Sequence, residues 1–200
     1  MSRVRLFTGI ELPSDVIAAL VAVKRAIRQE VPSWREEKWV AEQNLHVTLK
    51  FIGDVEQGEV EGVRAALSAV APCARSFVLE ATGVRAVPSA GRAAMLWATF
   101  DDPGTGGAWL ASALGCALEP WGVEEDKRPF SAHATLVRAR RQHAFPQGVL
   151  SSLAEPTQGA VSAMSVSTFT LFSSTLMPSG PVYEVVERWT LSEPAMACDR

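Results

Sequence analysis

Alternating hydrophobic and polar positions predict β-strands along much of the chain. The runs are rich in β-branched and aromatic residues, which favours half-buried strands over helices. We expect one hairpin around the turn at 88–92 and another around 177–180. The predicted strands are 3–12, 45–53 ending at Gly53-Asp54, 76–87, 93–100, 131–140, 161–176 and 181–191, with a short extended piece at 38–40.

A second pattern, with apolar residues three or four positions apart, predicts three helices between the strands. The first spans 13–31 with Ser14 or Asp15 as its N-cap, and the second spans 56–71 and ends before Pro72. The third follows a loop within 101–122. Because hairpins alternate with helices, the pattern favours an α+β fold over a parallel doubly wound sheet.

A short motif occurs twice: HVTL begins at His46 and HATL begins at His133. The flanks repeat as well, because LFTGI at 6–10 and LWATF at 96–100 each precede a predicted helix. Weak self-similarity over much of a chain is typical of two duplicated lobes. We therefore expect a bilobal domain whose lobes are related by a pseudo-twofold, each with an antiparallel sheet and packed helices, and with an active-site groove between them.

The domain should occupy residues 1–192, and residues 193–200 should form a C-terminal tail. Side chains two apart on a strand share a face, so His46 lies on the face of Thr48, and His133 on the face of Thr135. The opposite, core-facing positions are then Val47, Leu49 and Phe51 in the first strand and Ala134 and Leu136 in the second.

Two imidazoles that face one substrate suit acid–base catalysis, because histidine titrates near pH ~6.5. One takes a proton from water while the other protonates a leaving oxygen. Threonine hydroxyls beside them can stabilise charge on nonbridging phosphate oxygens. These groups suffice to open a phosphodiester without a metal ion or a cofactor. His143, outside the repeated motif, is interpreted as structural.

Composition narrows the setting of this chemistry. The net charge of −3 gives no global positive field for nucleic acid, although a local basic cradle remains compatible with it. The three cysteines show no CxxC spacing, and neither a signal peptide nor an apolar run of about 20 residues is present. We expect a cytoplasmic protein that does not span a membrane.

Four blocks now make the sequence recognisable: RLFTGIELP, WVAEQNLHVTLKFIGDV, RPFSAHATLVRAR and LFSSTLMPSGPVYEVVERW. Over nearly its whole length the chain resembles the two-histidine phosphoesterases, and specifically the RNA 2′,3′-cyclic phosphodiesterases, also called 2′-5′ RNA ligases. The resemblance implies hydrolysis of a terminal 2′,3′-cyclic phosphate on RNA to a 2′-phosphomonoester. It also implies joining of tRNA halves through a 2′-5′ linkage without ATP. We expect a monomer.

The resemblance carries over to particular residues. It assigns catalytic roles to Thr48, Thr135 and both motif histidines, with His133 as the base that activates water and His46 as the acid that protonates the ribose 3′-oxygen. It also implies that Arg138 binds phosphate. Strict alternation would place Arg138 on the face opposite the histidine, so it reaches the groove only if the strand ends or bulges near Val137.

Other basic residues are candidates for substrate binding. Lys50 shares the predicted face of His46 and is a candidate contact to substrate. A basic span in an otherwise acidic protein is either a cradle for the RNA backbone or a solvated surface; it comprises Lys127, Arg128, Arg138, Arg140 and Arg141.

Three alternative functions remain open at this level. A small cyclic or 2′-5′-linked nucleotide is the first alternative substrate. A non-catalytic RNA-binding module is the second alternative, although retention of both histidines and both threonines argues against it. A metallophosphoesterase is the third, but no Asp, His and Asn cluster accompanies either motif.

Overall fold

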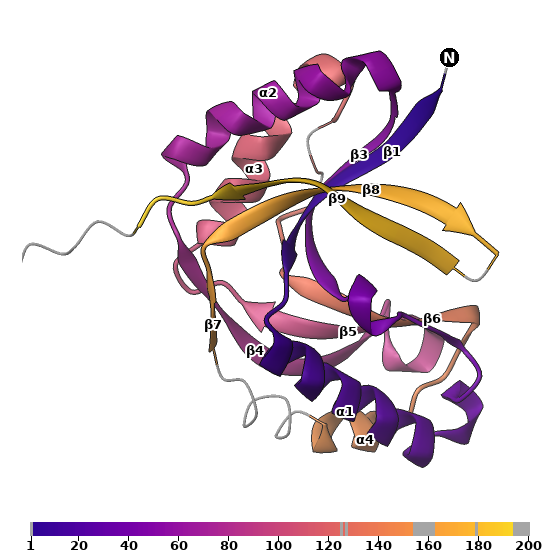
Figure 1. Ribbon diagram of the computed structural model, residues 1–200. Coiled ribbons are helices and arrows are strands. Elements are labelled where there is room, and N and C mark those ends of the chain that lie inside the picture. Colours follow the sequence, from indigo (N-terminus) through magenta and orange to yellow (C-terminus); the bar gives the residue numbers. More distant parts are fainter. Residues whose placement is uncertain (1, 125, 127, 154–162, 179, 194–200) are drawn as a thin grey trace, which may run out of the picture.

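Nine strands form a single antiparallel sheet within the described part of the chain (Figure 1). The computed structural model describes residues 2–124, 126, 128–153, 163–178 and 180–193. The strand order is β7-β4-β5-β6-β3-β1-β8-β9, with β2 paired to β6. The bounds are β1 Arg3–Glu11, β2 Lys38–Trp39, β3 His46–Glu56, β4 Phe77–Val87, β5 Ala93–Asp101, β6 His133–His143, β7 Ala163–Val166, β8 Thr168–Met177 and β9 Gly180–Thr190.

The sheet divides into two lobes at the junction of β3 and β6. The ladder between these strands consists of one residue pair, Val47 with Ala134, and both side chains are fully buried. We call β3, β1, β8 and β9 the first lobe, and β7, β4, β5, β6 and β2 the second lobe. In Figure 1 the two lobes diverge from this junction. The predicted α+β class is confirmed.

Helices cover both lobes, and two of them, α1 and α3, cross from one lobe to the other (Figure 1). α1 follows β1 of the first lobe but lies against the second, and just beyond it Trp34 donates to Ala144 O and stacks on His143. α3 follows β5 of the second lobe and contacts β3 of the first. The helices are α1 Ser14–Glu30, α2 Val60–Val70, α3 Gly106–Ala117 and α4 Gln147–Ser152.

Short 3-10 turns flank several of these elements, at Pro32–Trp34, Glu42–Asn44, Gln57–Glu59, Ala71–Cys73, Ala90–Arg92 and Glu119–Trp121. The N-cap prediction for α1 is wrong: the cap residue is Pro13, and no side chain closes the first turn. Asp15 instead lies inside the helix, where its Oδ1 accepts a hydrogen bond from the backbone N–H of Val16.

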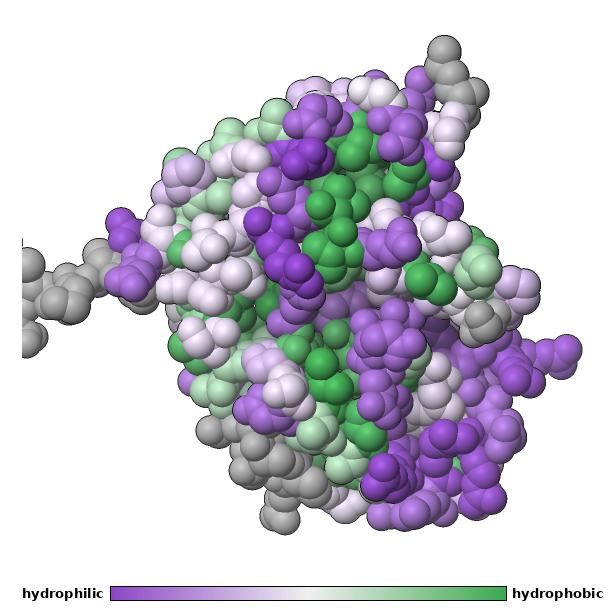
Figure 2. All heavy atoms as spheres, viewed as in Figure 1, coloured by the Kyte–Doolittle hydropathy of each residue, from purple (hydrophilic) through white to green (hydrophobic). Residues whose placement is uncertain are grey.

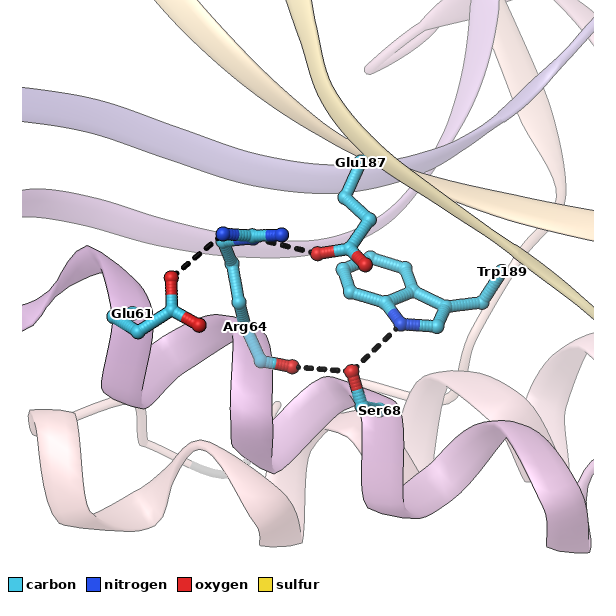
Figure 3. Close-up of polar contacts among 5 residues, drawn as sticks. All are labelled: Glu61, Arg64, Ser68, Glu187 and Trp189. Carbon is cyan, nitrogen blue, oxygen red and sulfur yellow. Dashed lines mark hydrogen bonds and ion pairs between the residues drawn. The ribbon is translucent and has the colours of Figure 1, made fainter.

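Polar contacts fasten α2 to the last strand of the sheet (Figure 3). Arg64 binds Glu187 on β9 at 2.6 Å and Glu61 on its own helix at 2.6 Å. One turn further on, Ser68 Oγ donates to Arg64 O and accepts a hydrogen bond from Trp189 Nε1. The indole of Trp189 also stacks on Phe169 of β8. These contacts hold the β8–β9 hairpin, which supplies part of the site described below.

Several strand predictions have the wrong limits, among them that for β6, which continues to His143 instead of ending at residue 140. β3 does not end at Gly53-Asp54, because Gly53 adopts a positive φ of 90° and stays paired with Leu6 of β1. The run 161–176 is two strands rather than one: β7 pairs with β4 in the second lobe, whereas β8 pairs with β1 in the first. Residues 194–200, most of the predicted tail, lie outside the described residues.

Candidate active site

The strand register brings the two repeated motifs together at the lobe junction. Because Val47 pairs with Ala134 in an antiparallel ladder, His46 stands across from Thr135, and Thr48 across from His133. The flanking side chains of that pair project to one face of the sheet, opposite the buried Val47 and Ala134. The sequence thus predicted the meeting of the two His-Thr pairs, and the structure shows the register that produces it.

Each motif is followed by a β-bulge at the equivalent leucine. Leu49 is the extra residue between the pairs Thr48–Gly9 and Lys50–Thr8, and Leu136 is the extra residue between Thr135–Trp97 and Val137–Leu96. Each bulge places two consecutive residues on the core side and reverses the alternation beyond it. The strand therefore has the bulge that Arg138 needs in order to reach the histidine face.

The first bulge overturns two expectations. Phe51 is not in the core: its side chain is 67% exposed and its ring lies 6.0 Å from that of Phe7, which also contacts His46. Lys50 does not share the face of His46. It is only 5% exposed, and its Nζ donates to Glu124 O and Asp126 Oδ2, both at 2.8 Å. The basis for a substrate contact by Lys50 is therefore lost.

His46 is held in one orientation by its neighbours. Its Nδ1 bonds Asn44 O at 2.8 Å, so this nitrogen carries the proton and Nε2 is the basic nitrogen in the neutral ring. Nε2 bonds Thr48 Oγ1 at 3.0 Å. The ring packs against Phe7 and edge-on to Tyr183.

Glycine is required beside this ring. A Cβ at Gly9 would lie 2.8 Å from Val47 O and 3.3 Å from Cδ2 of His46. Contacts of this length force a neighbour to move, so the missing side chain lets the imidazole lie flat against β1. The glycine of the first flank repeat thus has a positioning role.

His133 repeats the arrangement in the second lobe. Its Nδ1 bonds Ser131 O at 2.7 Å, again a carbonyl two residues upstream, which leaves Nε2 as the nitrogen for proton transfer. The ring stacks on Trp97 with centroids 3.7 Å apart, and the guanidinium of Arg85 lies over the ring of the same tryptophan, 5.4 Å from its centroid.

Burial and nearby cations lower the pKa of both histidines. Desolvation is the largest cause at each ring, and the bonded carbonyl partly offsets it. The charge of Arg138 lowers the pKa of His46 and also that of His133, and Arg85 adds to the effect at His133. Since the charged form is disfavoured, the neutral imidazole predominates near pH 7 in the protein without an anion bound.

Arg138 and Tyr183 complete the set of side chains at the junction. Arg138 is exposed, its Nη1 lies 2.8 Å from Met95 Sδ, and its charge acts on Tyr183 as well as on both histidines. Burial raises the pKa of the Tyr183 phenol, so the hydroxyl stays protonated and can donate a hydrogen bond. One guanidinium thus faces the functional groups of both lobes.

The rest of the basic span is dispersed. Arg140 and Arg141 are both exposed in the last part of β6, where its pairing with β5 departs from a regular register. Arg128 is exposed in the loop before β6, and Lys127 lies outside the described residues. Of the span, Arg138 is the member that acts electrostatically on both histidines.

Sequence reasoning missed several residues that contact the histidines. Phe172 and Tyr183 come from the β8–β9 hairpin, more than a hundred residues after His46, so no local pattern links them to the motif. Trp97 on β5 stacks on His133. The repeated flanks LFTGI and LWATF could have identified two of these aromatic residues. Phe7 and Trp97 occupy the second position of the two flanks, and each contacts the histidine of its own lobe.

Among the described residues, no group of three or more His, Cys, Asp or Glu side chains is placed to hold a metal ion. No helix in the described ranges is long and apolar enough to cross a membrane.

Known proteins resemble this chain in sequence and in fold. The model of the LigT-like phosphoesterase family matches residues 10–97. An RNA 2′,3′-cyclic phosphodiesterase of Thermus thermophilus is 31% identical over 94% of this chain and 90% of its own length. One from Archaeoglobus fulgidus is 27% identical over 90% of this chain and 96% of its own. The crystal structure of Escherichia coli LigT complexed with 3′-AMP, 24% identical, superposes with a TM-score of 0.74 and covers 95% of this chain and 99% of that one.

Proposed function

The chain belongs to the LigT-like phosphoesterase family that includes the RNA 2′,3′-cyclic phosphodiesterases, and from that premise we propose that it hydrolyses a terminal 2′,3′-cyclic phosphate on RNA to a 2′-phosphomonoester. The observation that carries the proposal is the matched state of the two motif histidines. Each uses Nδ1 to bond a backbone carbonyl two residues upstream, so each keeps Nε2 for proton transfer. Both rings lie at one junction, where the charge of Arg138 acts on each of them.

The proposed reaction is one displacement at phosphorus. His133, neutral because burial and two arginines lower its pKa, takes a proton from water as the water oxygen attacks phosphorus. The bond from phosphorus to the ribose 3′-oxygen breaks, and His46 gives its proton to that oxygen. Both imidazoles then return to their starting states by exchange with solvent.

His46 must be protonated for this step although its pKa is lowered in the free protein. A bound phosphodiester supplies a negative charge beside the ring, and a nearby anion favours the charged imidazole. Binding of the substrate therefore favours the protonated form of His46 that the reaction needs. His133 differs by its proximity to Arg85, which favours its neutral form and supports its role as the base.

The remaining groups stabilise charge on the phosphoryl oxygens. We assign Arg138 to bind a nonbridging oxygen, with Thr48 and Thr135 as hydroxyl donors from either side. In a site of low dielectric, each such hydrogen bond stabilises the transition state by more free energy than the same bond would in water. With a guanidinium and two imidazoles in place, the proposed reaction needs no metal ion.

The proposal also covers the cellular compartment, the oligomeric state and the RNA substrates. The protein acts as a cytoplasmic monomer on RNA ends, with tRNA halves as candidates and 2′-5′ ligation as the reverse type of transesterification. The described cysteines, Cys73 and Cys116, are free and exposed, which supports a reducing compartment.

The test is turnover of a short RNA with a 2′,3′-cyclic phosphate end, with the product mapped by enzymatic digestion in the presence of excess EDTA. The proposal predicts a 2′-phosphomonoester at a rate that EDTA leaves intact. Loss of activity that magnesium or manganese restores would refute the metal-free mechanism. Turnover of cyclic mononucleotides with none on RNA would favour a small-nucleotide enzyme.

A further inference from the structure

A recess lies at the second lobe, between the C-terminal half of α1 and the segment that contains β2. Its volume is about 690 Å³, within the range of sites that hold small ligands. We call it the α1–β2 groove. The side chains that define it are Lys24, Arg25, Arg28, Arg35, Trp39 and Glu42.

The charge of this groove is opposite to that of the protein. Of the eleven residues that line the groove, four are cationic and one is anionic, whereas the whole chain carries a net charge of −3. Arg25, Arg28 and Arg35 are exposed. Figure 2 shows hydrophilic side chains gathered over this end of the molecule, at the lower right. Such a concentration of positive charge in an acidic protein selects an anionic ligand.

One cation is held inside the recess. Lys24 is 9% exposed, and its Nζ donates to Val40 O at 2.6 Å. An ammonium has three N–H donors, so this bond leaves two. Burial lowers the pKa of Lys24, the charge of Glu42 partly offsets this and that of Arg28 adds to it, so a further anion in the groove would favour the charged ammonium.

The groove also has a fixed aromatic wall. Trp39 Nε1 donates to Trp34 O at 3.1 Å and to Arg35 O at 3.2 Å, so the indole is held by its edge. The guanidinium of Arg28 lies 6.0 Å from its ring centroid, and Arg35 Nε donates to Arg28 O. Arginine beside an immobilised indole is a combination that recognises nucleotides, because phosphate binds the cation and a base stacks on the ring.

β2 connects this groove to the candidate active site. Trp39 lines the groove, and its neighbour Lys38 pairs with Arg138 in the β2–β6 ladder. Paired residues of an antiparallel ladder project to the same face, so the exposed Lys38 extends the positive charge of Arg138 toward the edge of the sheet. A strand of nucleic acid that leaves Arg138 would meet Lys38 next and the groove after it.

We propose that the α1–β2 groove binds the sugar-phosphate backbone of the RNA strand upstream of the reacting end, and so sets a preference for RNA over cyclic mononucleotides. This inference rests on the proposed function. Arg25, Arg28 and Lys24 neutralise phosphates, Trp39 stacks on a base, and Lys38 bridges the two sites. A mononucleotide fills the catalytic junction but is too short to reach the groove.

The experiment compares kcat/KM on an RNA octamer with a 2′,3′-cyclic phosphate end against kcat/KM on 2′,3′-cyclic AMP. We expect Arg25→Gln/Arg28→Gln to lower the octamer-to-mononucleotide ratio by roughly tenfold or more, because two phosphate contacts are lost. The slope of log(kcat/KM) for the octamer against log[salt] should become shallower by about 1.4. The matched control is Arg3→Gln/Arg75→Gln, which removes two exposed arginines outside the groove and should keep the wild-type ratio.

The outcomes separate the groove from the catalytic proposal. If the wild-type protein turns over neither substrate, the proposed function fails. If it turns over both and the groove variant keeps the wild-type ratio and salt slope, the groove proposal is refuted while the function stands. An equal loss with the control variant would mean that general charge, rather than this groove, attracts RNA. Because both helix positions are exposed, Arg25→Gln alone provides a second folded variant if the double variant is unstable.

Discussion

Phe51 and Arg138 occupy equivalent positions in the two lobes. Each stands five residues after the histidine of its own motif, and each follows a bulge at the leucine of that motif. Both side chains are exposed. The equivalent bulges therefore place an aromatic ring at the junction in one lobe and a cation in the other. The two lobes are pseudo-symmetric in backbone, but the surface that faces the substrate is asymmetric.

Removal of the cation should change the titration of both motif histidines. In Arg138→Gln the pKa of His46 and that of His133 should rise, because the guanidinium lowers both by disfavouring a second positive charge. The measurement is an NMR titration of the imidazole Cε1 protons in the free protein. Inorganic phosphate added to the wild-type protein should shift both pKa values in the same direction.

Arg141→Gln is the matched control for that titration, since Arg141 is an exposed arginine of the same strand and is not among the charges that shift the pKa of either histidine. It should leave both histidine titrations as in the wild-type protein. If Arg138→Gln moves neither histidine, the guanidinium does not act at the junction and its assignment to the phosphoryl oxygens fails.

The threonines should contribute to rate rather than to folding. Thr48→Ala and Thr135→Ala should each lower kcat roughly 10- to 1,000-fold, the effect of losing one transition-state donor. Thr48→Ser, which keeps the hydroxyl, should recover most of the activity, and Thr175→Ala on the exposed part of β8 should have no effect. Full activity in both alanine variants would place the phosphate elsewhere.

Lys50 should matter for stability instead of substrate binding. Lys50→Met leaves Glu124 O without its donor, so the free energy of unfolding should fall by about 1–3 kcal/mol. Asp126→Asn, in an ion pair whose carboxylate is 70% exposed, should cost about 1 kcal/mol or less. Denaturant unfolding checks both values. A tenfold rise in KM of Lys50→Met at unchanged stability would restore the substrate-binding role.

The sequence was sufficient for the parts of the site that repeat. Two HxTL motifs with matching flanks predicted that His46, Thr48, His133 and Thr135 face one another, and the register of Val47 with Ala134 produces that arrangement. It was insufficient where the backbone departs from strict alternation. An extra residue at Leu49 or Leu136 leaves no mark in composition, yet it reverses the direction of the side chains that follow, up to the next irregularity of the strand.

Other failures have a different physical origin. The chain crosses from β7 in the second lobe to β8 in the first through Ser167 alone, with no glycine or proline to mark the break. Phe172 and Tyr183 reach His46 through the pairing of β8 with β1, a contact between segments far apart in sequence. Local sequence patterns predict neither the break between β7 and β8 nor the contacts of Phe172 and Tyr183 with His46, because both depend on which strands pair in the folded chain.

The division of labour between the histidines can be tested by changing the leaving group. A nitrophenyl phosphodiester releases an anion that leaves without protonation, so it should rescue His46→Ala far more than His133→Ala. The measurement is the ratio of rates on the nitrophenyl substrate and on cyclic-phosphate RNA for each variant. Preferential rescue of His133→Ala would reverse the assigned roles while the two-histidine mechanism stands.

The most direct test of the central claim is hydrolysis of a cyclic-phosphate RNA end in ¹⁸O-labelled water by the wild-type protein, both single alanine variants and the double variant of His46 and His133. Because the two imidazoles act in one step, each single variant should lose roughly as much rate as the double variant. The wild-type product should be a 2′-phosphomonoester with one ¹⁸O atom in its phosphate. A 3′-phosphomonoester, or a single variant that keeps most of the wild-type rate, would contradict the account.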